Sequence, residues 1–102
     1  MKYITTVRGL LKDTDEKQAQ TAHDAAVDKL SPVGRPLGSI GHQAYLNPQN
    51  RRLFLAVDTW NNLEGLQKFL SDPNTAAGIG SLFDGQPDIT VWIEAGWRSF
   101  SE

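Results

Sequence analysis

The sequence contains two histidines, and the first lies where it can act on a bound molecule. Apolar residues at helical spacing accompany it, and the resulting stripe comprises Ala19, His23, Ala26 and Leu30. This spacing predicts a helix whose apolar face packs against other elements, and the small alanines leave room beside the imidazole. We expect His23 to act as a general base or as a hydrogen-bond donor to a ligand between helix and sheet. The alternative is a buried histidine bonded to a backbone carbonyl or to Asp58.

The second histidine, His42, lies in a predicted strand, and the hairpin that follows brings it toward a carboxylate. On the predicted register the side chains of His42, Asp58 and Trp60 point to the same face of the sheet. Asp58 would then raise the pKa of an imidazole toward neutrality. Together with the first histidine, His42 and Asp58 form the candidate catalytic set. The alternative for Asp58 is a helix cap or an ion pair with Arg52 or Arg8.

We predict no metal ion and no other cofactor. The side chains of His23, His42 and Asp58 are of types that bind iron or zinc, but they lie on separate elements and no spacing imposes a site. Gly78 and Gly80 do not lie between a strand and the start of a helix, as phosphate-binding loops require. The chain has no cysteine, which excludes disulfides, thiolate metal sites and cysteine nucleophiles. Any chemistry would rest on the imidazoles and the carboxylate.

Large aromatic side chains could line a pocket for a small apolar or aromatic molecule. The candidates for ligand binding are Tyr45, Trp60, Phe69, Phe83 and Trp92. Such residues are first of all core and interface residues, and this is the simpler interpretation of Phe69. Trp60 and Trp92 have polar neighbours along their strands, which favours a solvated pocket wall for both.

Composition limits the class of protein and its partners. The 102 residues suit a single domain, expected over residues 1–102, and 39% hydrophobic with 22% charged residues is typical of a folded chain. The net charge is −2 and no basic run exceeds the pair Arg51-Arg52, so we expect no nucleic acid partner. The sequence has no apolar stretch of the roughly 20 residues that a membrane span needs. We expect a soluble protein of the reducing cytoplasm, without a membrane partner.

Local signals predict the elements. Two prolines and two glycines between residues 31 and 38 predict a loop there, while Asp15 and Asn61 or Asn62 can cap helices. The predicted elements are a strand at 2–11, a helix from about 15 to Leu30, strands at 39–46 and 52–60, a helix ending at Ser71, a short helical stretch within 74–83 and a strand at 88–97.

The turn between the two middle strands sets the predicted register. If Asn50 adopts the left-handed conformation, the hairpin has a three-residue loop and Asn47 pairs with Arg51. The pairs that follow are Ala44 with Phe54, His42 with Ala56, and Ile40 with Asp58. A slip of one residue would exchange the two faces of the sheet.

The order β-α-β-β-α-β predicts a ferredoxin-like α+β fold, with a four-stranded antiparallel sheet and both helices on one face. The other face would then carry apolar side chains, and these are expected to be Leu53, Leu55, Val57, Ile89, Val91 and Ile93. An apolar face of this size is unfavourable in water, so we expect a second copy of the chain to cover it. The predicted assembly is a homodimer.

In the stretch from Val57 to Pro73 a predicted strand ends with an acidic residue, Asp58, and a tryptophan, Trp60, and an amphipathic helix follows. This pattern resembles the dimeric α+β barrel superfamily, especially the antibiotic-biosynthesis monooxygenase-like (ABM) proteins. The resemblance implies a cofactor-independent monooxygenase-like enzyme on an aromatic or polyketide-like substrate, with His23 as the base. A non-catalytic ligand-binding or accessory dimer is the alternative, and a purely structural dimer is a third possibility.

Two departures from the pattern bear on this resemblance. The haem-degrading branch resembles the chain at Trp60, but it also uses an Asn in the first strand and a His after the second helix. Neither is found at those places in this sequence, which argues against a haem function. Related proteins often carry a His in the second helix where this chain has Phe69.

Overall fold

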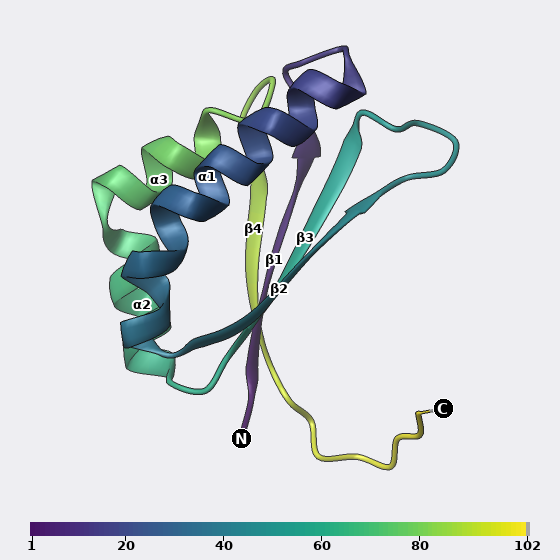
Figure 1. Ribbon diagram of the computed structural model, residues 1–102. Coiled ribbons are helices and arrows are strands. Elements are labelled where there is room, and N and C mark those ends of the chain that lie inside the picture. The colour runs from purple at the N-terminus through teal and green to yellow at the C-terminus, as the bar shows by residue number, and fades with distance from the viewer. Residues whose placement is uncertain (102) are drawn as a thin grey trace.

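The computed structural model describes residues 1–101 in the order β-α-β-β-α-α-β (Figure 1). The elements are β1 (Tyr3–Leu10), α1 (Glu16–Leu37), β2 (Ser39–Leu46), β3 (Leu53–Trp60), α2 (Leu63–Ser71), α3 (Pro73–Gly80) and β4 (Asp88–Ile93). The strands form one antiparallel sheet of order β2-β3-β1-β4, and the helices cover one of its faces. The predicted ferredoxin-like α+β fold is confirmed, with the short helical stretch before β4 present as α3.

The core lies between the sheet and α1. It is formed by Val7, Leu11, Ala19, Phe54, Ala56 and Phe83. These side chains come from the helix-facing positions of β1 and β3, from the residue that follows β1, from one stripe of α1, and from the turn after α3. No helix within residues 1–101 is both long and apolar enough to cross a membrane.

Helix α1 is longer than predicted, since it continues to Leu37 through the segment expected to be a loop. Pro32 and Pro36 lie inside the helix, where each removes one backbone hydrogen bond to the residue four positions earlier. Both prolines and Asp28 are exposed, so water can bond to the freed carbonyls of Asp28 and Pro32. The helix ends instead at Gly38, whose φ of 115° suits glycine.

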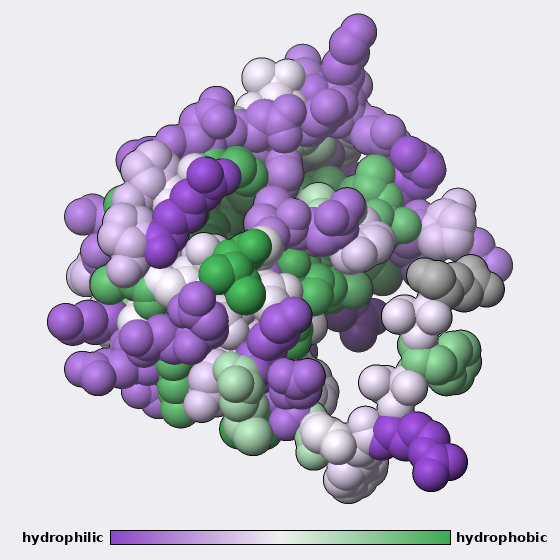
Figure 2. All heavy atoms as spheres, turned by 60° about the horizontal axis from the view of Figure 1, so that its bottom comes forward, coloured by the Kyte–Doolittle hydropathy of each residue, from purple (hydrophilic) through white to green (hydrophobic). Residues whose placement is uncertain are grey.

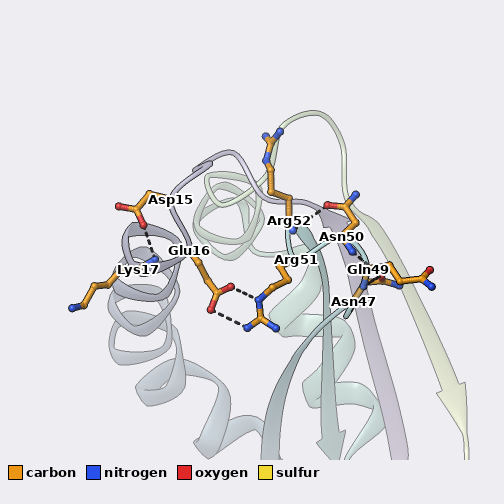
Figure 3. A network of polar contacts seen from close by, with 8 residues as sticks. All are labelled: Asp15, Glu16, Lys17, Asn47, Gln49, Asn50, Arg51 and Arg52. Carbon is orange, nitrogen blue, oxygen red and sulfur yellow. Dashed lines mark hydrogen bonds and ion pairs between the residues drawn. The ribbon is translucent and has the colours of Figure 1, made fainter.

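The hairpin loop differs from the predicted three-residue turn. No residue other than glycine has a positive φ within 1–101, so Asn50 is not left-handed. The loop is held by the side chain of Asn47, whose Oδ1 accepts hydrogen bonds from the amides of Gln49 and Asn50 at 2.9 and 3.0 Å (Figure 3). The strands resume where the amide of Asn47 donates to the carbonyl of Leu53. The loop is therefore longer than predicted.

The longer loop displaces the register by two residues. His42 lies opposite Asp58 rather than Ala56, and Ala44 lies opposite Ala56 rather than Phe54. Because side chains alternate with period two, this displacement leaves both faces as predicted. Ile40, expected opposite Asp58, is instead the extra residue of an irregularity between Ser39 and Gly41.

An ion pair joins the start of α1 to the hairpin loop. The Arg51 guanidinium donates to both carboxylate oxygens of Glu16, at 2.5 Å from Nε and 3.0 Å from Nη2 (Figure 3). Arg52 donates to the carbonyl oxygen of Leu11 rather than to Asp58. Asp15 caps α1, since its side chain accepts from the amide of Lys17. The N-terminal end of α1 is thus held over the β2-β3 hairpin.

The last strand presents the opposite faces from those predicted. Cross-strand partners share a face, and Ile89 pairs with Val7 while Val91 pairs with Thr5. Ile89, Val91 and Ile93 therefore lie on the helix-facing side, and Trp92 lies on the open face. Alternation within a strand separates its two faces, but only the register identifies which of them faces the helices.

The chain leaves the sheet after Ile93, earlier than the predicted end at Trp97. Residues 94–101 extend away from the body of the molecule (Figure 1), and Figure 2 shows open space between this tail and the rest of the surface. Trp97 and Phe100 are 85% and 97% exposed. These two side chains therefore add nothing to the core.

Candidate active site

Both histidines and Asp58 lie in one chain of hydrogen bonds between α1 and the sheet. The Nε2 atoms of His23 and His42 are 2.9 Å apart, and Nδ1 of His42 is 2.5 Å from Oδ1 of Asp58. At the other end, Nδ1 of His23 is 2.9 Å from Oδ1 of Asp24. The ring centroids of the histidines are 5.1 Å apart with planes 22° from parallel, so the rings meet edge to edge along their shared hydrogen bond.

Three elements position this chain, and each does so through a local feature. The apolar stripe of α1 directs His23 toward the sheet, where its ring contacts Phe54 at a centroid distance of 5.7 Å. The register of the hairpin places His42 and Asp58 directly opposite each other on β2 and β3. Since β2 is an edge strand, His42 lies at the border of the sheet, where α1 crosses it. The roles of these residues in catalysis stay a prediction.

The number of protons on the two hydrogen-bonded imidazoles sets the charge of this group of side chains. Carboxylates only accept hydrogen bonds, so the bonds to Asp24 and Asp58 require a proton on each Nδ1. The bond between the two Nε2 atoms requires a third proton, whereas two neutral imidazoles carry only two. The fully bonded chain is thus an imidazole–imidazolium pair between two carboxylates. Removal of the third proton leaves two facing lone pairs, which can accept a proton from another molecule.

Asp58 favours the protonated form of His42. Its hydrogen bond and its negative charge raise the pKa of His42 above the ordinary value, although partial burial acts in the opposite direction. The side chains of His23 and His42 are 17% and 34% exposed, so solvent reaches both imidazoles only in part. The charged groups that face the pair are Asp24 on α1 and Asp58 on β3.

We predict that Asp58→Asn lowers the pKa of His42, because the neutral amide no longer stabilises the imidazolium. A group whose pKa is raised by folding stabilises the folded state at pH values below its unfolded pKa, and this stabilisation is lost as the pH rises through the folded pKa. Stability should therefore fall with rising pH in the native protein, and this dependence should weaken in Asp58→Asn. NMR titration of the imidazole protons, together with thermal unfolding at several pH values, measures both effects.

Asp88→Asn is the matched control, since it removes a carboxylate on the far edge strand. Asp88→Asn should leave the midpoint of the His42 titration unchanged. An unchanged midpoint in Asp58→Asn as well would show that Asp58 does not control this imidazole.

A half-open cavity of about 120 Å³ lies beside the histidine pair. His23, His42, Asp58 and two serines, Ser31 and Ser39, form its polar side. The rest of its wall is apolar and includes Val7, Val27, Leu30, Ile79 and Leu82. A mostly apolar cavity with a few polar groups at one side is the usual form of a small-molecule site.

Two aromatic contacts form part of the cavity wall. Trp60 and Phe69 lie at a centroid distance of 5.2 Å, and Phe54 and Phe83 at 5.6 Å. All four side chains line the cavity. Three of the five predicted ligand-binding aromatics, Trp60, Phe69 and Phe83, are therefore placed where they can contact a ligand.

The other two predicted ligand-binding aromatics are not in the cavity. Tyr45 pairs with Leu55 and Trp92 with Ile4, so both lie on the open face of the sheet. They are 50% and 54% exposed, and the indole nitrogen of Trp92 donates to the hydroxyl of Thr6 at 2.9 Å. Polar neighbours along the strand were therefore a misleading signal for Trp92.

Two buried polar atoms near the site have no hydrogen-bond partner within the described residues. One is Nε1 of Trp60, in a residue only 2% exposed. The other is the hydroxyl oxygen of Thr5, a residue that pairs with Asp58 on the neighbouring strand. An unpaired buried donor destabilises a folded protein by about 1–3 kcal/mol, so such atoms need an explanation. Both atoms are buried from solvent, so the fold carries this cost without a partner among the described residues.

Sequence reasoning missed three polar residues of the site. Ser31 is the first residue of the segment that was expected to be a loop and Ser39 follows that segment, and only the continued helix brings Ser31 over the sheet. Asp24 does not belong to the apolar stripe of α1 and was not a candidate, although its position next to His23 could have suggested a partner. The proposed roles of Asp58 as a helix cap or as a partner of Arg52 are wrong, because Asn62 caps α2 and Asp58 bonds to His42.

No group of three histidine, aspartate or glutamate side chains within residues 1–101 is arranged to hold a metal ion. His23 and His42 direct their Nε2 atoms at each other, and their Nδ1 atoms are directed at carboxylates. This arrangement leaves acid–base chemistry as the function that the side chains themselves can perform.

Comparison with known proteins identifies the fold. The sequence matches no protein-family profile and no curated protein. A variant of SnoaB, a cofactor-independent oxygenase from Streptomyces nogalater, superimposes with a TM-score of 0.72 at 10% identity, over 99% of this chain and 98% of that one. Rv0793 from Mycobacterium tuberculosis has a TM-score of 0.66 at 16% identity, over 97% and 100%. A candidate antibiotic biosynthesis monooxygenase from Deinococcus radiodurans has a TM-score of 0.69 at 14% identity, over the full length of both chains.

These similarities extend over nearly the whole chain, and the structures share the α+β ferredoxin-like architecture. The chain therefore has the fold of the antibiotic biosynthesis monooxygenase proteins, as the resemblance implied.

Proposed function

We propose that this protein binds a small aromatic or polyketide-like molecule in the cavity and acts on it as a cofactor-independent monooxygenase-like enzyme. One observation carries the proposal: the hydrogen-bonded chain of His23, His42 and Asp58 faces an apolar cavity. The shared fold with SnoaB, which is described as a cofactor-independent oxygenase, supports the same reaction class. Since fold alone does not define function, the assignment rests on the site.

In the proposed mechanism the histidine pair removes a proton from a substrate that carries an acidic hydroxyl or an activated CH2 group. Asp58 stabilises the imidazolium that forms, which makes the pair a stronger base near neutral pH. The electron pair left on the substrate reduces dioxygen and forms a carbon–oxygen bond, and the imidazolium returns its proton to give a hydroperoxide. Loss of the second C–H proton and cleavage of the O–O bond release water. The net reaction converts CH2 and O2 into a carbonyl group and H2O.

Apolar cavity walls fit this role because they exclude water from the reacting atoms. We also propose the cytoplasm as the compartment, because a chain without cysteine suits a reducing environment.

The test is oxygen uptake by the purified protein, without added metal or cofactor, in the presence of hydroxylated aromatic compounds. The expected product is heavier than the substrate by one oxygen and lighter by two hydrogens, as measured by mass spectrometry. Saturable binding without oxygen uptake or product would favour the non-catalytic ligand-binding or accessory protein. Absence of both binding and turnover would leave a structural role.

We further propose that the protein is a homodimer in which two open sheet faces pack together. This face carries Leu53, Leu55 and Val57 together with the exposed rings of Tyr45 and Trp92. Exposed apolar patches of this kind mark interaction sites in soluble proteins. The proposal retains the expected homodimer, with Trp92 in place of Ile89, Val91 and Ile93.

The double variant Tyr45→Lys/Trp92→Lys should be monomeric, because it places charges on both edge strands of the open apolar face while leaving the core untouched. Sedimentation velocity at micromolar concentration measures this change. Ile93→Lys is the control, since it adds a charge on the helix-facing side of β4 and should leave the dimer intact. A native protein that sediments as a monomer under these conditions would disprove the dimer.

A further inference from the structure

The size of the cavity limits the molecule that it can hold. Its volume is about 120 Å³. An apolar cavity of about 150 Å³ in another protein binds a single benzene molecule. The cavity beside the histidines therefore has room for one aromatic ring, and further fused rings would have to extend through its open side into water.

The aromatic residues at the cavity wall are held firmly, so the cavity cannot lengthen at low cost. Phe83 is packed against the backbone of β1, where a methyl group built on Gly9 would come within 2.6 Å of its ring. Trp60 is almost fully buried between Phe69 and Gly34 of α1. Protein cores are close-packed, and displacement of such rings costs typically about 1–3 kcal/mol.

The histidine pair limits the functional group of the ligand. With both Nδ1 atoms bonded to carboxylates, the two Nε2 atoms face each other with room for one proton. A hydroxyl group can replace this contact, because it donates to one Nε2 and accepts from the other once that atom is protonated. An ether or a carbonyl can only accept, and it would leave one imidazole nitrogen unpaired.

We propose that the cavity binds a single-ring phenol whose hydroxyl oxygen lies between the Nε2 atoms of His23 and His42. His23 turns away from His42 to admit the oxygen, which then lies roughly 2.8 Å from each nitrogen. The ring fills the apolar part of the cavity, between the pair Trp60 and Phe69 and the pair Phe54 and Phe83. This inference rests on the proposed function, and it narrows the aromatic or polyketide-like substrate to a monocyclic one.

Calorimetric titration with phenol, anisole and 2-naphthol tests the inference, with NMR of the histidine imidazoles as a second measurement. Phenol should bind and shift the signals of both His23 and His42. Anisole has the same ring but no hydroxyl proton, and it should bind at least about tenfold more weakly. 2-Naphthol keeps the hydroxyl but adds a ring, and it too should bind at least about tenfold more weakly. Equal binding of anisole, or tighter binding of 2-naphthol, would overturn the inference.

Phe69→Ala removes a partly exposed ring from the cavity wall and should make room for a second ring. This variant should bind 2-naphthol at least as well as phenol. Phe69→Leu removes less volume, so its affinity for 2-naphthol relative to phenol should lie between those of Phe69→Ala and the native protein. Thermal unfolding verifies that both variants are folded, and an unchanged preference for phenol in both would contradict the proposed wall.

The outcomes separate this inference from the proposed function. If phenol binds as described but no oxygen uptake accompanies any phenol, the ligand class stands and the enzyme activity is wrong. If 2-naphthol is bound and oxidised in preference to phenol, the enzyme activity stands and the single-ring limit is wrong.

Discussion

Replacement of His23 by glutamine should lower turnover by about 10²- to 10⁴-fold, the usual contribution of a general base. Glutamine keeps a hydrogen-bonding group at the site but does not accept a proton at neutral pH. His42→Gln should have a loss of the same order, because the two imidazoles share one proton. Residues that act as a unit are not additive, so the double variant should lose no more than either single variant. Steady-state oxygen uptake with a hydroxylated aromatic compound measures all three.

Gln20→Ala is the matched control, since it changes an exposed side chain on the same helix, three residues before His23. It should retain native turnover. The glutamine variants should also keep melting temperatures close to the native value, because His23 and His42 are only partly buried. Native turnover in His23→Gln would exclude the histidine as the base, and a lost fold would instead assign it to the core.

Gly65→Ala should cause the largest loss of stability, because α2 meets the end of α1 at this residue. A methyl group built on Gly65 would lie 1.7 Å from the carbonyl oxygen of Leu37. The clash is with backbone, so the two helices must separate, and the expected loss is about 3 kcal/mol or more. For a chain of this size each kcal/mol lowers the melting temperature by roughly 4–8 °C. Thermal and urea unfolding followed by circular dichroism measure the change.

Gly80→Ala is the comparison for this prediction. Gly80 ends α3, and a methyl group there would have no atom within 4 Å. Gly80→Ala should change the free energy of unfolding by no more than about 1 kcal/mol, and we expect the variant to be the more stable protein. If Gly65→Ala is as stable as Gly80→Ala, then the close approach of α1 and α2 does not exist in solution.

Much of the fold follows from patterns of short range. Strand-forming residues located β1, a turn between two strand-like runs located β2 and β3, and alternation of side chains located β4. Cap residues located the starts of α1, at Asp15, and of α2, at Asn61 or Asn62. The shared face of His42, Asp58 and Trp60 was predicted on a wrong register, because a displacement of two residues preserves the faces. The turn itself was mistaken, since the side-chain oxygen of Asn47 replaced the left-handed residue that a shorter loop would need.

The remaining differences depend on contacts that a sequence does not display. Whether a helix tolerates Pro32 and Pro36 depends on whether water can reach the freed carbonyls, which is a property of the packed molecule. The direction of Trp92 depends on the register between β1 and β4, which lie at opposite ends of the chain. For the same reason Ser31 could not be assigned to the site, since its place over the sheet requires the continued helix.

One part of the apolar cavity wall comes from a different stretch of the chain than the histidines and Asp58. His23, His42 and Asp58 lie on α1, β2 and β3, whereas Ile79, Leu82 and Phe83 contribute wall from the segment that follows α2. Substitutions in residues 73–83 can therefore alter the shape of the cavity while the acid–base groups keep their positions. In evolutionary terms, a change confined to this one short segment can alter the shape of the cavity while the hydrogen-bonded histidine pair is inherited unchanged.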